Sequence, residues 1–94
     1  MTESWPDNAQ IRIHPQVLLR PVEDEAVLLH LDEGTYYGLN DVGARMIQVV
    51  HQNADLGAAV EQLRQEYDVE ATRLRADLHR LLDEMAAQGL IVVE

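Results

Sequence analysis

Apolar and polar residues alternate in short runs through the N-terminal half of the chain, a pattern that predicts β-strands. The run at residues 17–20 is the first good candidate, and Pro21 either ends it or places it at the edge of a sheet. Residues 26–31 and 35–39 are two further strand-like runs, joined by the turn-forming sequence DEG. These two runs are therefore predicted to pair as a β-hairpin.

From residue 40 onward the apolar residues follow the helical spacing i, i+3, i+4, i+7. This spacing predicts three helices of about 12, 12 and 18 residues, joined by short loops. Each helix is preceded by residues whose side chains can accept hydrogen bonds from free backbone N–H groups: Asn40 or Asp41, Asp55 and Asp68. Gly89 is suited to ending the third helix, so residues 90–93 are predicted to form a short final strand.

The predicted order of elements defines an α+β domain, with an N-terminal three-stranded antiparallel sheet, then three helices and a short C-terminal strand. Three helices with a β-hairpin are the layout of winged helix-turn-helix domains, a fold that serves several functions. The length of 94 residues suits one domain with a single core. We place this domain at residues 11–94. Residues 1–10, including Trp5, lack periodicity and are expected to form a flexible tail.

The chain is strongly acidic. Its 17 acidic residues against seven basic ones, all of them arginine, give a formal net charge of −10. Such a charge repels phosphate backbones, and the scattered arginines form no basic patch, so nucleic acid is an unfavourable partner. No apolar run has transmembrane length and no basic segment precedes an apolar stretch. We therefore expect a cytoplasmic protein that does not bind membranes.

Sequence patterns for catalysis and metal binding are missing. There is no cysteine, the hydroxyl residues lie in no nucleophile motif, and the glycines are too dispersed for a phosphate loop. The four histidines show neither the H-E-x-x-H pattern nor i, i+4 pairing. We therefore expect no enzymatic activity, no metal site and no cofactor.

The hairpin offers a different kind of chemistry, because its second strand can have an open edge. Backbone N–H and C=O groups at such an edge can pair with an extended peptide, or with a second copy of the chain, so the oligomeric state stays open. Tyr36 and Tyr37 must point to opposite faces of this strand. One is expected in the core and the other toward a peptide or a partner surface, and the sequence leaves their assignment open.

Residues 27–49 resemble the PqqD-like family, whose members are also called RiPP recognition elements. The resemblance lies in the apolar strand VLLHL, the turn DEG, the sequence YYGLN and the helix opening DVGARMIQ. Its most specific part is YGLN followed by G-A, at residues 37–44. The later helices and the terminal GLIVV extend the match to about residues 17–93.

This resemblance implies that the chain binds the leader segment of a ribosomally made precursor peptide and presents it to a modifying enzyme. The leader would add as a strand to the edge of residues 35–39, in the groove between that strand and the third helix. The strand residues implied in peptide binding are Thr35, Tyr36, Tyr37, Gly38 and Leu39. On the third helix, Leu74, Leu78 and Leu81 are expected to line pockets, with Asp77 at the rim.

Several functions stay open at this level. The sequence YYGLN resembles most the separate recognition protein of lasso-peptide pathways, whose partner is a cysteine protease that removes the leader. The alternative is the subunit that serves a radical-SAM enzyme in making the cofactor PQQ. A winged-helix DNA-binding regulator is disfavoured by the charge, and a generic protein-interaction adaptor would use the same open edge. Each implied helix residue also has a plainer interpretation, core packing for the leucines and a solvated face for the charged residue.

Overall fold

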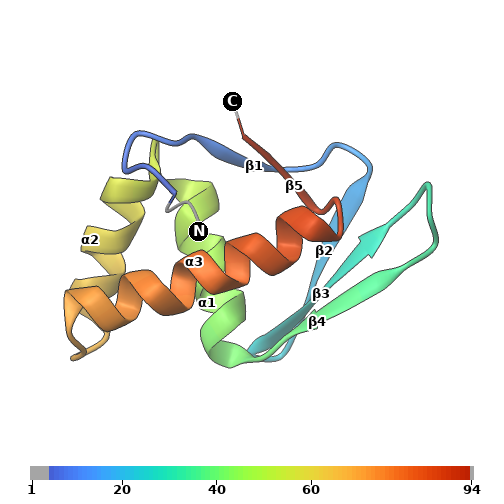
Figure 1. The fold of residues 1–94 in the computed structure, drawn as a ribbon. Coiled ribbons are helices and arrows are strands. Elements are labelled where there is room, and N and C mark those ends of the chain that lie inside the picture. The colour runs from blue at the N-terminus through green and yellow to red at the C-terminus, as the bar shows by residue number, and fades with distance from the viewer. Residues whose placement is uncertain (1–4, 94) are drawn as a thin grey trace.

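Five strands and three helices make up residues 5–93 in the computed structural model, and Figure 1 shows α3 crossing in front of α1 while the β3–β4 hairpin projects to one side. The elements are β1 (Ile11–Ile13), β2 (Val17–Val22), β3 (Glu25–His30), β4 (Tyr36–Leu39), α1 (Asp41–Gln52), α2 (Leu56–Glu66), α3 (Ala71–Ala87) and β5 (Ile91–Val93). This order confirms the predicted α+β architecture, with a three-stranded antiparallel sheet followed by three helices and a terminal strand.

The sheet has the strand order β2-β3-β4, and both of its ladders are antiparallel. Leu28 in the central strand lies opposite Leu19 on β2 and Tyr37 on β4, and its side chain is fully buried. Because side chains alternate between the faces of a strand, these positions define the inner face, which packs against α1. The residues between them lie on the outer face.

One N-terminal strand differs from the prediction, and another follows one of its two predicted alternatives. Residues 11–13 form β1, which pairs with β5 in a separate two-stranded sheet. The strand β2 continues through Pro21 to Val22 and lies at the edge of the sheet, which is the second of the two alternatives predicted for Pro21. The sheet accepts this proline because β2 is an edge strand, where a missing N–H leaves no neighbouring strand unsatisfied.

The caps of the first two helices are as predicted. The Asn40 side chain accepts a hydrogen bond from the Gly43 amide at the start of α1, and Asp55 accepts one from the Ala58 amide at the start of α2. At the end of α3, Gly89 has a φ of +71°, a left-handed conformation that glycine adopts without steric cost. These local signals therefore marked the helix ends correctly.

The predicted cap of the third helix is wrong. This helix begins at Ala71, with Glu70 in the N-cap position and no side-chain hydrogen bond to the helix end. Asp68 lies two residues before the N-cap position, in the turn between α2 and α3. It therefore does not cap this helix.

The N-terminal segment differs from the expected flexible tail over residues 5–10. Ala9 is 5% exposed and belongs to the core. The Trp5 indole N–H donates a hydrogen bond to the Asp83 carboxylate on α3 at 2.8 Å. Residues 1–4, the other part of the expected tail, lie outside the described residues.

The core between the sheet and the helices is aliphatic and draws on every helix. Its fully buried large side chains are Leu28, Ile47, Val49, Leu56, Leu63, Leu78, Leu82, Met85 and Leu90. Within residues 5–93, none of the helices combines the length and apolar character that crossing a bilayer requires.

Candidate functional site

The outer edge of β4 is open. This strand pairs with β3 on one side, and no strand among residues 5–93 lies on its other side. On the paired side, the His30 N–H donates to the Thr35 carbonyl at 2.9 Å. Because bonded and non-bonded pairs alternate along an antiparallel ladder, every second residue from Thr35 bonds to β3. The backbone N–H and C=O groups of Tyr36 and Gly38 therefore face the open edge.

The opposite edge of the sheet, on β2, is less suited to receiving a strand. The same alternation turns Val17, Leu19 and Pro21 outward there. The Val17 N–H already donates to the His14 carbonyl at 2.9 Å, and proline has no N–H. Of the three outward residues on β2, Leu19 alone has an N–H that could pair with an added strand. The edge of β4 is therefore better suited than the edge of β2 to binding an extended peptide.

The two adjacent tyrosines have different environments. Tyr37 is half-buried, and its hydroxyl donates to Glu84 Oε1 on α3 at 2.5 Å. This hydrogen bond, together with burial, raises the pKa of Tyr37 above its ordinary value of 10.0. Tyr36 lies on the outer face of the sheet and is 76% exposed. Tyr37 is thus the core-side tyrosine, and Tyr36 is the one available to a ligand.

A cavity of about 240 Å³ lies at the end of β4, between the start of α1 and α3. We call it the α1–α3 groove, and it is lined by Asn40, Val42, Gly43, Met46, Asp77, Arg80, Leu81 and Glu84. Met46 is buried and Leu81 half-buried, which gives the groove an apolar base. Arg80 forms an ion pair with Asp77 at 3.2 Å on the surface of α3. The groove therefore joins an apolar base to a charged rim.

The helix residues implied in binding divide into two groups. Leu81 and Asp77 line the α1–α3 groove, as expected. Leu74 and Leu78, however, are 3% and 0% exposed, and both pack in the core. Both side chains are therefore shielded from a ligand at this surface.

The five strand residues lie together along β4 or just before it. Thr35, Tyr36 and Gly38 are exposed, Tyr37 is half-buried, and Leu39 is 5% exposed. An alanine Cβ at position 38 would meet no heavy atom within 4 Å. This part of the edge is therefore accessible, whereas Leu39 belongs to the core.

Six of the eight groove residues were absent from the sequence-based site, among them Val42, Met46 and Glu84. Val42 and Met46 fall on the apolar stripe of α1, which marked them only as core candidates. Glu84 gave no signal at all, because its contact with Tyr37 joins residues 47 positions apart in the chain. Helical periodicity places residues on a face but says nothing about the strand end opposite that face.

An open strand edge beside a helix-lined groove, on a winged-helix-like framework, is an arrangement that can receive an extended peptide. Residues 25–91 match the family of coenzyme PQQ synthesis protein D (PqqD). The chain therefore belongs to the PqqD family, which confirms the resemblance noted from the sequence.

Two solved structures are similar to this chain over nearly its whole length. TbiB1 in complex with the TbiA(beta) leader peptide has a TM-score of 0.79 and 32% sequence identity, covering 85% of this chain and 93% of that chain. A lasso peptide synthetase B1 complexed with the leader peptide has a TM-score of 0.80 and 26% identity, covering 89% of this chain and 99% of that chain. No curated protein matches the sequence.

Proposed function

We propose that this chain binds the leader segment of a ribosomally synthesised precursor peptide by β-strand addition to β4 and delivers it to a partner enzyme. The observation that carries the proposal is the outward-facing backbone of Tyr36 and Gly38 beside the α1–α3 groove. The similarity to two leader-peptide complexes supports the nature of the ligand.

Affinity and selectivity come from different parts of this site. Backbone hydrogen bonds to Tyr36 and Gly38 set the register of the added strand, and they act on any peptide sequence. Alternate side chains of the leader enter the α1–α3 groove, where Leu81 supplies apolar surface and Asp77 a carboxylate at the rim. Leu74 and Leu78 support this surface from the core rather than contacting the peptide.

The chemistry on the precursor belongs to the partner. We favour a leader-removing cysteine protease of a lasso-peptide pathway. Both similar structures are complexes with a leader peptide, and one of the two proteins is a lasso peptide synthetase B1. The description of the matching family favours a second candidate, a radical-SAM enzyme of PQQ synthesis. The two candidates use the same edge of β4 but different leaders.

Fluorescence polarisation with a labelled leader from the neighbouring precursor gene tests the ligand. We expect saturable binding with a Kd from nanomolar to low micromolar, or roughly −12 to −8 kcal/mol. A PQQ-precursor segment, titrated in parallel, distinguishes the two pathways by which peptide binds more tightly. Absence of saturation at tens of micromolar with both peptides would exclude leader binding of this kind.

Gly38→Pro tests the mode of binding with little disturbance of the sheet. The Gly38 N–H faces the open edge, so proline removes a bond to the leader while the ladder to β3 stays intact. We expect at least a tenfold loss of affinity, since one lost hydrogen bond and the added ring act together. Gly38→Ala is the matched control, because its Cβ has open space and the N–H is retained. Equal affinity of a folded Gly38→Pro protein and the parent would show that the leader does not add to β4.

A further inference from the structure

A second and larger cavity lies on the other side of α1, between that helix, the β2–β3 turn and the end of α2. Its volume is about 530 Å³, within the range of about 300–1,000 Å³ for ligand-binding clefts. We call it the acidic cleft and define it by its acidic residues Glu23, Asp24, Glu25 and Asp41 and its apolar residues Pro21 and Tyr67. It shares no lining residue with the α1–α3 groove, so a leader bound there would leave it open.

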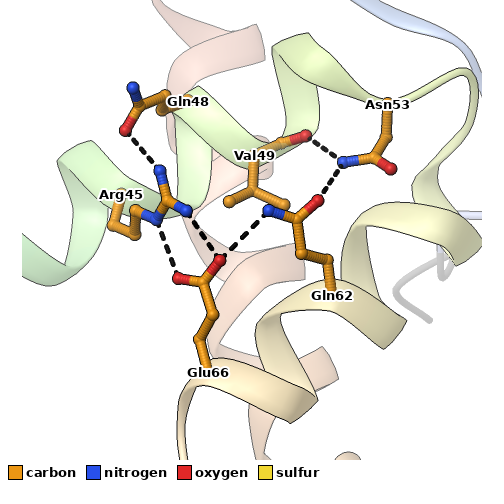
Figure 2. A network of polar contacts seen from close by, with 6 residues as sticks. All are labelled: Arg45, Gln48, Val49, Asn53, Gln62 and Glu66. Carbon is orange, nitrogen blue, oxygen red and sulfur yellow. Dashed lines mark hydrogen bonds and ion pairs between the residues drawn. The ribbon is translucent and has the colours of Figure 1, made fainter.

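The basic residue that lines this cleft is already neutralised. Arg45 donates from Nε and NH2 to the Glu66 carboxylate at 2.8 and 2.6 Å, and from NH1 to Gln48 at 2.7 Å. Figure 2 shows these contacts continuing through Gln62 to Asn53, which ties α1 to α2. The ion pair lowers the pKa of Glu66 to about 2. Near neutral pH both side chains are charged, and Arg45 is paired with Glu66 rather than with the other carboxylates of the cleft.

The four acidic residues that define the cleft are not neutralised in this way. None of them takes part in the ion pairs found among residues 5–93. Glu23 has a φ of +57° in the turn between β2 and β3, a conformation that glycine adopts more easily. The turn therefore places a carboxylate at its left-handed position.

The arrangement of these carboxylates favours an extended cationic ligand over a metal ion. Among residues 5–93, no group of three or more His, Asp or Glu side chains could hold a metal. Separate carboxylates around an apolar surface instead match arginine or lysine side chains, which pair with carboxylates individually and pack their aliphatic stems on apolar groups. The surface of Pro21 and Tyr67 provides that packing.

We infer that the acidic cleft docks a segment of a partner protein in which arginine or lysine side chains alternate with apolar ones. This second surface does not require the leader to bind at β4. It gives the chain a way to hold a partner protein and a leader at the same time, on opposite sides of α1.

Amide chemical-shift mapping of the ¹⁵N-labelled full chain at low salt tests this inference, with acetyl-Arg-Leu-Arg-Leu-amide as the probe. We expect saturable shifts centred on Ala44, Gln48 and Tyr67, which line the cleft. Acetyl-Glu-Leu-Glu-Leu-amide should cause none, and acetyl-Arg-Gly-Arg-Gly-amide should bind at least threefold more weakly. Shifts centred on β4, or no saturation with the first peptide in the millimolar range, would overturn the inference.

Two charge-matched variants separate the cleft from the general acidic field of the chain. Glu23→Gln/Asp24→Asn/Glu25→Gln removes three of the four carboxylates that define the cleft and should weaken the probe at least fivefold. Asp32→Asn/Glu33→Gln/Glu70→Gln changes the net charge equally but lies outside the cleft, and it should weaken the probe less than twofold. Equal weakening in both variants would mean that the probe responds only to net charge. Failure of this test leaves leader binding unaffected, because the leader assay reports on β4.

Discussion

The Tyr37 hydroxyl is the point where β4 is joined to α3, through its hydrogen bond to Glu84. The bond holds the inner side of the strand against the helix while the Tyr36 and Gly38 backbone faces outward. A single residue therefore supports the geometry of the proposed edge without belonging to its surface.

Replacing Tyr37 with phenylalanine should remove this bond and keep the ring in place. We expect a loss of about 0.5–1 kcal/mol in the free energy of unfolding, the usual net value of such a bond. Tyr36→Phe is the control and should change stability by less than about 0.5 kcal/mol, because the exposed Tyr36 side chain makes no comparable contact. Urea denaturation measures both. Glu84→Gln should also lower the pKa of Tyr37 in an ultraviolet titration, and an unchanged titration would contradict the assigned cause.

The caps give a second contrast between residues of one type. Asp55→Ala should cost about 1 kcal/mol, because the Asp55 carboxylate accepts the Ala58 N–H at the start of α2. Asp68→Ala should cost less than about 0.5 kcal/mol, since Asp68 caps no helix. Thermal denaturation of the two variants compares them directly. A larger cost for Asp68→Ala would mean that α3 begins earlier than Ala71.

At the scale of the elements, residues 5–10 act as a strap across the helices. Arg75 on α3 donates to the Asp7 carboxylate at 2.5 Å, and the Leu56 amide at the start of α2 donates to the Ala9 carbonyl at 2.9 Å. Trp5 reaches Asp83 further along α3. The strap therefore spans α2 and α3 and adds Ala9 to the core.

Ala9→Asp should release this strap, because it places an unpaired charge at a position only 5% exposed. The expected result is a red shift in the emission of Trp5, the only tryptophan in the sequence, together with a loss of stability. Asn8→Asp makes the same kind of change at an exposed neighbouring position and should leave the emission unchanged. Identical spectra for Ala9→Asp and the parent would show that Trp5 is held independently of Ala9.

At the scale of the whole molecule, negative charge is in large excess over positive charge. The net charge is −10, and among the ion pairs found within residues 5–93 the Arg45–Glu66 pair alone links two helices. The excess negative charge favours cationic partners at long range and weakens as salt screens it. The acidic cleft is where this field meets an apolar surface.

The Arg45–Glu66 pair predicts a specific acid response. The folded-state pKa of Glu66 is about 2, below its ordinary value of 4.5. Its contribution to stability is therefore full above pH 4.5 and disappears as the pH falls toward 2. Glu66→Gln should be less stable than the parent near neutral pH, and the difference should close over this interval in urea denaturation. Arg45→Gln should show the same closing difference, and a difference independent of pH would argue against the pair as its source.

The sequence by itself determined most of the elements and the family. Strand alternation, helical spacing and caps act between residues a few positions apart, so they can be read without the fold. The hairpin, the ends of α1 and α2 and the turn at Gly89 were therefore predicted correctly, and the motif YYGLN identified the PqqD-like class.

Only the tertiary structure decided how those elements meet. The inward position of Tyr37 depends on Glu84, 47 positions away, and the docking of Trp5 on Asp83 joins residues 78 positions apart. The pairing of β1 with β5 joins the two ends of the described chain in the same way. Such contacts form where the packed core brings distant segments together, and no local pattern encodes which distant side chain will be there.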